Sequence, residues 1–241
     1  MDRPGNLNSF TPELRTQLAA ALEEAAQDPS VRVIVLGGSG RFFSAGADLK
    51  RGPAGTESIR AILLKEYKPV FDAVVQAPQP VIAAVRGGAA GIGMSLAMAC
   101  DLVVMEENAF LLCPFSNIGL IPDGGSTWTL TQAIGHRAAF EFAVSGDRMP
   151  ASRAKELNLV NRLAPPRRAL ATAESWAAEL TLKAPLALAG TKKLMRKAET
   201  LSFDDMFMAE AEAQEACSST ADAAEGIAAF LEKRAPRFTG E

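Results

Sequence analysis

Short apolar runs of the kind that form buried strands recur in the first half of the chain. They are rich in β-branched residues, are bounded by turn formers, and cover 31–36, 80–85 and 102–105. Apolar residues at helical spacing predict helices over 11–27, 59–75 and 94–100. The Gly- and Pro-rich segment 52–57 is predicted to be a loop. This alternation of strands and helices predicts an α/β fold.

The second half of the chain is predicted to be nearly all helical from about Ser126 onward. Prolines separate five amphipathic runs, which cover 151–157, 168–183, 186–198, 203–217 and 220–232. These helices carry more apolar surface than one small core covers. We therefore expect the chain to assemble into a homotrimer or homohexamer.

Composition and charge bound the class of protein. With 241 residues, of which 48% are hydrophobic, the chain can bury a full core. A net charge of −3 offers no basic face for nucleic acid. The three cysteines, Cys100, Cys113 and Cys217, are too widely spaced to indicate a disulfide framework or a metal site. They fit a reducing compartment.

The most apolar stretch, 81–104, is interrupted by glycines and by Arg86 and Asp101. It does not have the pattern of a membrane span, and the start of the chain does not resemble a secretion leader. We therefore expect a soluble, cytoplasmic protein that binds neither membrane nor nucleic acid.

Two glycine-bearing segments, 44–50 and 87–94, each follow a predicted strand. Small side chains allow backbone N–H groups to approach a ligand closely. Two such groups directed at one oxygen can stabilise a thioester enolate as it forms. The pattern therefore points to chemistry on an acyl carbonyl.

Several motifs also have simpler explanations. The glycines at 91 and 93 lack the third glycine of a dinucleotide-binding loop, where Leu96 stands instead, so NAD or FAD binding is not favoured. His136 is more typical of a solvated helix start than of a catalytic base. Asp123 lies in a Pro-Asp-Gly-Gly sequence that by itself is typical of a turn.

Motifs along the whole chain resemble the crotonase (enoyl-CoA hydratase/isomerase) superfamily. They cover 3–4 with 7–10, 43–49, 84–87, 97–101 and 230–234, in the expected order and spacing. The resemblance implies a spiral core of ββα units over 1–182 and a helical region over 183–241 that mediates trimerisation. It also implies an acyl-CoA substrate, with coenzyme A as part of the substrate and no separate cofactor or metal.

By motif position, the backbone N–H groups of Ala47 and Ile92 form the oxyanion hole that the resemblance implies. Ile92 is not glycine, but the donor belongs to the main chain, so the side chain does not remove it. The neighbouring residues expected to contact substrate are Ala45, Asp48, Leu49, Gly91, Phe115 and Trp128. Asp48 has an alternative role as a helix cap, and Phe115 and Trp128 as core residues.

The catalytic carboxylates depart from the hydratase pattern of the superfamily. The two glutamates that position and activate water in hydratases are replaced here by Ser95 and Phe115. Asp123 remains, at a position that resembles the aspartate of dienoyl-CoA isomerases and of ring-epoxide isomerases. The resemblance thus implies a single base that shuttles a proton.

Within the superfamily, the segments 115–128 and 237–240 are most similar to 2-(1,2-epoxy-1,2-dihydrophenyl)acetyl-CoA isomerases of phenylacetate breakdown. The expected function is an acyl-CoA isomerase that moves a double bond or rearranges a ring epoxide. Thioester hydrolysis, dehalogenation and non-catalytic acyl-CoA binding remain alternatives. Related proteins usually have strand residues before the motif at Arg3, so we expect the sheet to lack an edge strand.

Overall fold

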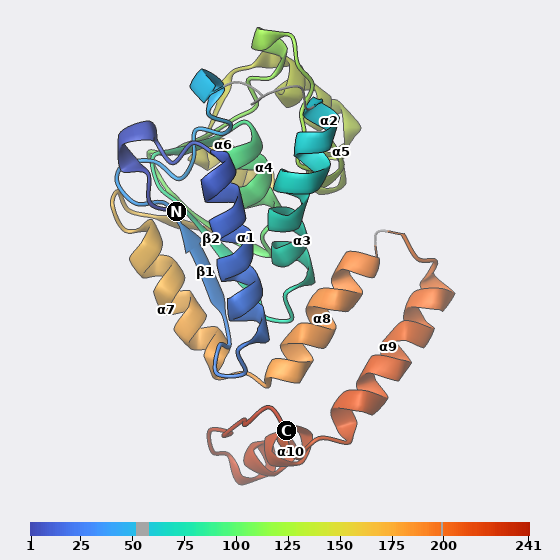
Figure 1. Ribbon diagram of the computed structural model, residues 1–241. Coiled ribbons are helices and arrows are strands. Elements are labelled where there is room, and N and C mark those ends of the chain that lie inside the picture. The colour runs from blue at the N-terminus through green and yellow to red at the C-terminus, as the bar shows by residue number, and fades with distance from the viewer. Residues whose placement is uncertain (52–57, 199) are drawn as a thin grey trace.

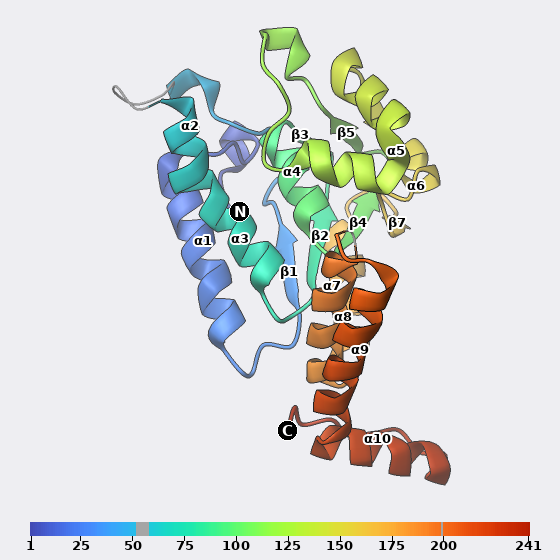
Figure 2. The same ribbon diagram turned by 90° about the vertical axis from the view of Figure 1, so that its right-hand side faces the viewer.

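A four-stranded parallel sheet forms the centre of the computed structural model, which describes residues 1–51, 58–198 and 200–241. Its strands, in spatial order, are β1 (Ile34–Gly37), β2 (Val81–Val85), β4 (Leu102–Glu106) and β7 (Arg162–Ala164) (β1 and β2 in Figure 1, all four in Figure 2). All five residues of β2 are buried. A parallel sheet covered on both faces requires such continuous apolar strands, and the predicted α/β class is confirmed.

A second sheet of three short strands lies beside the first. Its order is β3 (Gly88–Ala90), β5 (Phe110–Leu112) and β6 (Arg148–Pro150), with β3 parallel and β6 antiparallel to β5. None of these strands is predicted from the sequence, because three residues are too few to show a period of two. β3 also lies inside the glycine-bearing segment 87–94, for which no strand is predicted.

Helices cover both faces of the four-stranded sheet. α1 (Pro12–Gln27) and α3 (Lys68–Gln76) lie side by side on one face, and α7 (Ala169–Thr181) packs on the other (Figures 1 and 2). The Thr11 side chain caps α1 by accepting a hydrogen bond from the N–H of Leu14 at 3.3 Å. The apolar faces of these helices therefore close the core around the strands.

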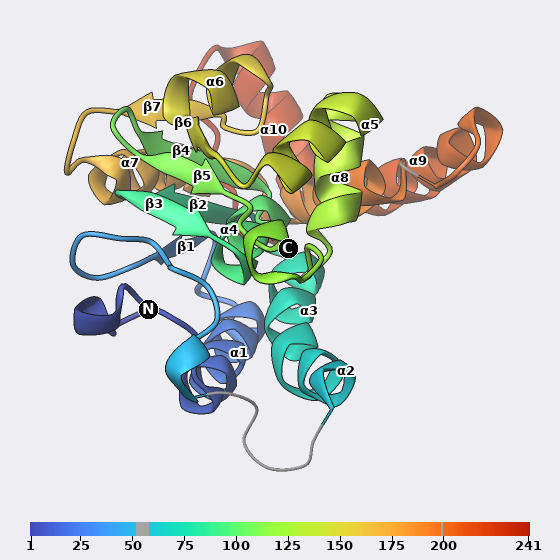
Figure 3. The same cartoon turned by 90° about the horizontal axis from the view of Figure 1, so that it is seen from above.

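α4 (Ile92–Ala99) is the most deeply placed helix, with seven of its eight residues buried. It contacts β3, α3 and α5 (Ser126–Ser145), and Figure 3 shows it in the middle of the molecule. α5 is interrupted at Gly135, whose φ of +76° is not helical. The remaining short elements are η1 (Pro4–Asn6), η2 (Leu49–Arg51), α2 (Ile59–Ile62), the π-helical turn η3 (Leu63–Tyr67), η4 (Ser116–Ile118) and α6 (Ala151–Glu156).

The last three helices project from the body of the molecule. α8 (Pro185–Lys197) and α9 (Phe203–Ser218) run side by side, and α10 (Ala221–Glu232) crosses their end (Figure 2). Neither α8 nor α9 contains a buried residue. The predicted domain boundary between 182 and 183 falls in the connection from α7 to α8 and stays a prediction.

β1 lies at one edge of the four-stranded sheet. There the N-terminal amine of Met1 donates a hydrogen bond to the carbonyl of Gly37 at 2.8 Å, and Ser39 N–H donates to the carbonyl of Met1 at 2.8 Å. The loop predicted at 52–57 lies outside the described residues. Across the part of the chain that the structure describes, no helix combines the length and apolarity needed to cross a bilayer.

Candidate active site

The first oxyanion segment is held in place by the N-terminal stretch 7–10. Ala45 N–H donates to the carbonyl of Leu7 at 2.9 Å, Phe10 N–H donates to Gly46 at 2.8 Å, and Asp48 N–H donates to Phe10 at 3.1 Å. Phe10 thereby pairs with Ala47 as in a parallel ladder. In such a ladder the peptide groups alternate in direction, so the N–H of Ala47 points away from Phe10. Among the described residues no backbone group accepts a hydrogen bond from this N–H, so it can bind a ligand.

The second donor lies at the start of α4. Ile92 is the first residue of this helix, and its N-cap is Gly91, which has no side chain to cap the N–H groups. The first N–H groups of a helix have no partner within the helix, and the helix dipole makes this end partially positive. The N–H of Ile92 can therefore bind a developing negative charge.

Gly46 shows that the two segments meet. A Cβ placed on Gly46 would lie 2.8 Å from the carbonyl oxygen of Ala90 and 3.5 Å from the nitrogen of Ile92. Gly46 also has a φ of +89°, which an L side chain rarely adopts. Both observations require glycine here. The fold thus brings the predicted donors, Ala47 and Ile92, to one place.

The two hydratase glutamate positions border this place. The ring of Phe115 is buried and lies 3.8 Å from a Cβ built on Gly91. Ser95 is fully buried, and its hydroxyl donates to the carbonyl of Gly91 at 3.3 Å. Ser95 also packs against Gly124, since a Cβ on Gly124 would lie 2.9 Å from the Ser95 Cβ. Both positions face the site and neither supplies a carboxylate.

Asp123 brings a carboxylate to the same region, on the turn that precedes α5. Its main-chain carbonyl accepts hydrogen bonds from the N–H and hydroxyl of Ser126 at 3.1 and 2.8 Å, which fix the turn. Its Oδ1 is buried without a hydrogen-bond partner. Burial raises the pKa of Asp123 from 3.8 to about 6, against a smaller lowering by its own backbone N–H. The carboxyl is therefore poised to exchange a proton near neutral pH.

Cys113 is close enough to Asp123 for the two to interact electrostatically. Burial, and secondarily the charge of Asp123, raises the pKa of the Cys113 thiol to about 11. The thiol therefore stays protonated and serves as packing, not as a nucleophile.

Tyr67 is a site residue that the sequence does not single out. It is the chain's only tyrosine, it is buried, and it lies in the π-helical turn η3, an irregularity often found at functional sites. The guanidinium of Arg15 lies 4.3 Å from the ring centre. Burial raises the pKa of Tyr67, the nearby Arg15 lowers it, and the charge of Asp123 raises it further, so the phenol and the Asp123 carboxylate are neighbours. In the sequence, the only feature that could have pointed to Tyr67 as a site residue is that it is the single tyrosine, within a run predicted to be helical.

An apolar cleft of about 600 Å³ runs alongside Tyr67 and the turn after Asp123. We call it the acyl groove. Its walls come from η3 and α3 on one side and from the start of α5, including Trp128, on the other, with Ala99 and Arg196 completing it. Trp128, predicted to contact substrate, is 44% exposed and borders this groove.

The remaining predicted substrate contacts are distributed around the first oxyanion segment. Ala45 is half-buried, and Leu49 is 68% exposed at the start of η2. The Asp48 carboxylate is bound by Arg3 at 3.2 Å. Burial favours a higher pKa for Asp48, but hydrogen bonds from Arg3 and Ser9 outweigh it and hold the pKa below its usual value. This ion pair gives Asp48 a structural role, and its contact with substrate stays a prediction.

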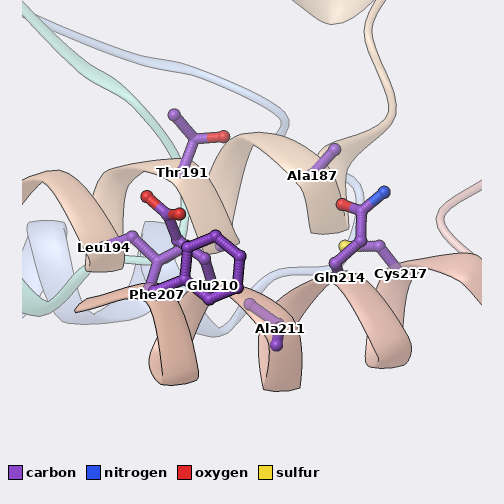
Figure 4. Close-up of a pocket in the computed structure, with 10 residues that line it drawn as sticks. Ala187, Thr191, Leu194, Phe207, Glu210, Ala211, Gln214 and Cys217 are labelled. Atoms are coloured by element: carbon purple, nitrogen blue, oxygen red, sulfur yellow. The ribbon is translucent and has the colours of Figure 1, made fainter. Parts of the chain in front are cut away.

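A separate groove of about 450 Å³ lies between α8 and α9 (Figure 4). Thr191 and Leu194 of α8 face Phe207, Ala211 and Gln214 of α9 across it. Neither the oxyanion donors nor Asp123, nor any residue next to them in the chain, borders this groove, whereas Gly124, which follows Asp123, borders the acyl groove. In residues 1–51, 58–198 and 200–241, three or more His, Cys, Asp or Glu side chains nowhere gather as a metal site would require.

Known proteins are similar to this chain over nearly its whole length. The 1,2-epoxyphenylacetyl-CoA isomerase of Escherichia coli is 35% identical over 247 residues, which span 100% of this chain and 94% of that protein. The crystal structure of an enoyl-CoA hydratase from Polaromonas sp. JS666 has a TM-score of 0.92 at 36% identity, covering 98% of this chain and 93% of that chain. An enoyl-CoA hydratase from Bacillus anthracis gives a TM-score of 0.93 at 33% identity, with 99% and 93% covered.

The predicted crotonase fold is therefore confirmed at the level of structure as well as sequence. A model of the family described as enoyl-CoA hydratase/isomerase matches residues 1–241. The chain belongs to the enoyl-CoA hydratase/isomerase family, the crotonase superfamily that its motifs resemble.

Proposed function

We propose that this member of the acyl-CoA hydratase/isomerase family is an isomerase, which moves a double bond or rearranges a ring-epoxide acyl-CoA. Asp123 is the proton shuttle, and the N–H groups of Ala47 and Ile92 hold the thioester oxygen. The observation that carries the proposal is the half-buried Asp123 carboxylate, whose pKa burial raises to about 6. Ser95 packs against the neighbouring Gly124 and Phe115 lies against Gly91, and neither supplies a carboxylate.

In the double-bond shift, the ionised Asp123 removes a proton from the acyl chain. The electron pair of the broken C–H bond moves into the conjugated system, and negative charge collects on the thioester oxygen. The two N–H groups stabilise this enolate. The protonated Asp123 then returns the proton to a different carbon, and the double bond has moved without a change in mass.

This cycle needs one base, because the same carboxyl removes and returns the proton. It needs no cofactor beyond the coenzyme A moiety of the substrate. Hydration in contrast requires a group that orients and activates water. Ser95 cannot replace a glutamate as that base, since a neutral hydroxyl, which here donates its hydrogen to the Gly91 carbonyl, is far less basic than a carboxylate.

The name of the Escherichia coli relative, 1,2-epoxyphenylacetyl-CoA isomerase, supports the ring-epoxide form of the reaction. The apolar groove with Trp128 and Phe71 suits a cyclic or unsaturated acyl group. Hydrolysis of the thioester or dehalogenation, with Asp123 in a different role, is the second candidate. It is favoured by the same carboxylate, which could attack a substrate carbon if one lies within reach.

Product mass separates these reactions. The protein is incubated with a panel of unsaturated, aromatic and epoxide acyl-CoAs, and products are followed by mass spectrometry. We expect products of unchanged mass and new retention time. Addition of water to crotonyl-CoA at the rate of an efficient enzyme, or release of free coenzyme A, would contradict the isomerase assignment.

We also propose that the chain assembles into a homotrimer or homohexamer through its projecting helices, α8 to α10. Large apolar side chains on α9 and α10 are strongly exposed, and they are Phe203, Phe207, Met208, Ile227, Phe230 and Leu231. Apolar surface on this scale is typical of an interface. Burial in an assembly would remove it from water.

A further inference from the structure

Three charged side chains meet where α8 joins the core. Asp101 lies directly before β4, and its Oδ2 is 2.8 Å from Lys192 Nζ while its Oδ1 is 2.7 Å from Arg196 Nη2. Two cations thus share one carboxylate. Nearby Cys100 is neutral, because burial raises the pKa of its thiol to about 12. The cluster therefore carries an excess of one positive charge.

Backbone carbonyls offset part of this charge. Lys192 donates to Val74 at 2.9 Å and to Gln79 at 3.0 Å, and Arg196 Nη2 donates to Ala99 at 2.8 Å, at the C-terminal end of α4. The C-terminus of a helix supplies only about half a negative charge. Burial lowers the pKa of Lys192, whereas Asp101 opposes this effect, so the cost of holding both cations here is appreciable.

Arg196 lies between this cluster and the acyl groove. Its side chain is 27% exposed and borders the groove. Within the described residues, both of its hydrogen bonds come from Nη2, and its buried Nε has no partner. The groove's other cation, Lys68, is occupied by Asp72 on the next turn of α3, with Nζ to Oδ1 at 2.7 Å. The buried Nε is out of reach of a ligand, so another anion would bind Arg196 through Nη1, for which the described residues supply no partner.

The position of Arg196 relative to the oxyanion donors follows from α4. Ile92 begins this helix and Ala99, which binds Arg196, ends it. Seven residue steps of an α-helix correspond to about 10 Å. The groove borders Ala99, Tyr67 and Gly124, and Gly124 packs against Ser95, one turn of α4 after Ile92. A chain that starts at a thioester at Ile92 and passes this contact would enter the groove beside Gly124 and run toward the guanidinium.

We propose that the acyl groove accepts an acyl-CoA whose far end carries a carboxylate, and that Arg196 binds this carboxylate. Charge complementarity selects this occupant over a plain alkyl chain, because a carboxylate neutralises the excess charge while methylenes cover the apolar walls. Arg196 is a specificity-determining residue and takes no part in proton transfer. The inference rests on the proposed function only in taking an acyl-CoA as the ligand of the site.

Binding of saturated, unreactive thioesters tests this without any catalytic step. Isothermal titration compares dicarboxylic mono-CoA thioesters with monocarboxylic acyl-CoAs of the same length, at six, eight and ten carbons. We expect the wild-type protein to bind at least one dicarboxylic thioester roughly 10- to 100-fold more tightly than its methyl-ended match, as expected for a charge-assisted hydrogen bond.

The variant Arg196→Gln should lose this preference and keep its affinity for the methyl-ended thioesters. Arg196→Lys, which retains the charge, should recover part of it. Lys193→Gln, an exposed neighbour on the same helix with the same loss of charge, is the matched control and should behave as wild type.

Two results would overturn the inference. One is that the wild-type protein binds the carboxylate-ended and the methyl-ended thioesters equally tightly at every chain length, which is the result expected if a second copy of the chain covers the groove. The other is an equal loss of affinity for both thioesters in Arg196→Gln, which would assign Arg196 a structural role alone. Since binding is measured without turnover, failure of the isomerase proposal leaves this test intact.

Discussion

Replacing Asp123 with asparagine should slow the enzyme and stabilise the protein at the same time. The carboxyl is half-buried, its Oδ1 has no hydrogen-bond partner, and burial raises its pKa from 3.8 to about 6. At neutral pH the folded protein therefore holds an ionised group where a neutral one is preferred. Asparagine has the same shape and carries no charge, so it removes this cost.

The magnitude follows from proton linkage. The folded state keeps the proton up to about pH 6, whereas the unfolded chain releases it near 3.8. Between these values the folded state binds more protons, so the wild-type protein loses stability as pH rises. The full difference corresponds to about 3 kcal/mol. Partial exposure to water reduces it, and we expect about 1–3 kcal/mol at pH 7.

Urea unfolding of wild type and Asp123→Asn at equal protein concentration, at several pH values from 4 to 8, measures this difference. The variant's advantage should be near zero at pH 4, grow up to about pH 6 and then level off. In parallel, turnover of the correct substrate should fall roughly 10²- to 10⁴-fold, with ligand affinity largely retained.

The wild-type kcat/KM should rise with pH through about 6 as the base of the free enzyme ionises. An advantage in stability that is independent of pH would refute the assignment of the pKa shift to burial of Asp123. Near-normal turnover in the variant would place the proton transfer on another residue.

Three further predictions concern the scaffold of the site. Gly46→Ala should lower kcat/KM at least about tenfold more than Gly119→Ala. Both glycines have positive φ, but only a Cβ on Gly46 would meet backbone, 2.8 Å from the Ala90 carbonyl oxygen. Steady-state kinetics of both variants tests this, and equal losses of kcat/KM would contradict it. Asp101→Asn should cost about 3 kcal/mol in urea unfolding, because it leaves two cations without their shared carboxylate, whereas Asp72→Asn, in an exposed pair, should cost less than about 0.5 kcal/mol. Light scattering should give the mass of three or six chains, and a monomer at all concentrations would exclude assembly through α9 and α10.

Long elements with a clear period were predictable from the sequence. The run at 80–85 forms β2, and the amphipathic runs of the second half form α6 to α10 within a residue or two of the predicted ends. The strand predicted over 31–36 begins later, at Ile34. Strands β3, β5, β6 and β7 were missed because each has three residues, and their strand geometry comes from tertiary pairing.

For the candidate site, glycine-bearing segments and the family resemblance pointed to the backbone donors Ala47 and Ile92, which the fold brings near each other, whereas Asp123 was proposed from the resemblance and its role stays a prediction. The roles of Tyr67 and Arg196 leave no such signal. Tyr67 reaches the site through a π-helical turn, and Arg196 reaches the acyl groove from α8, far along the chain. Contacts of that kind depend on how helices pack, which periodicity does not encode.

Arg196 belongs to α8 and also borders the acyl groove, so this one residue connects the groove with the projecting helices. Asp101 forms ion pairs with Lys192 and Arg196, and both of these residues lie on α8. The two ion pairs therefore fix the orientation of α8 and the position of the guanidinium that borders the groove. If a ligand binds Arg196 as proposed, it would stabilise one orientation of α8, and an assembly that fixed α8 in this orientation would prepare the groove for the ligand. By linkage the two effects are equal, so the dissociation constant of the assembly should change with ligand by the same factor as ligand affinity changes on assembly.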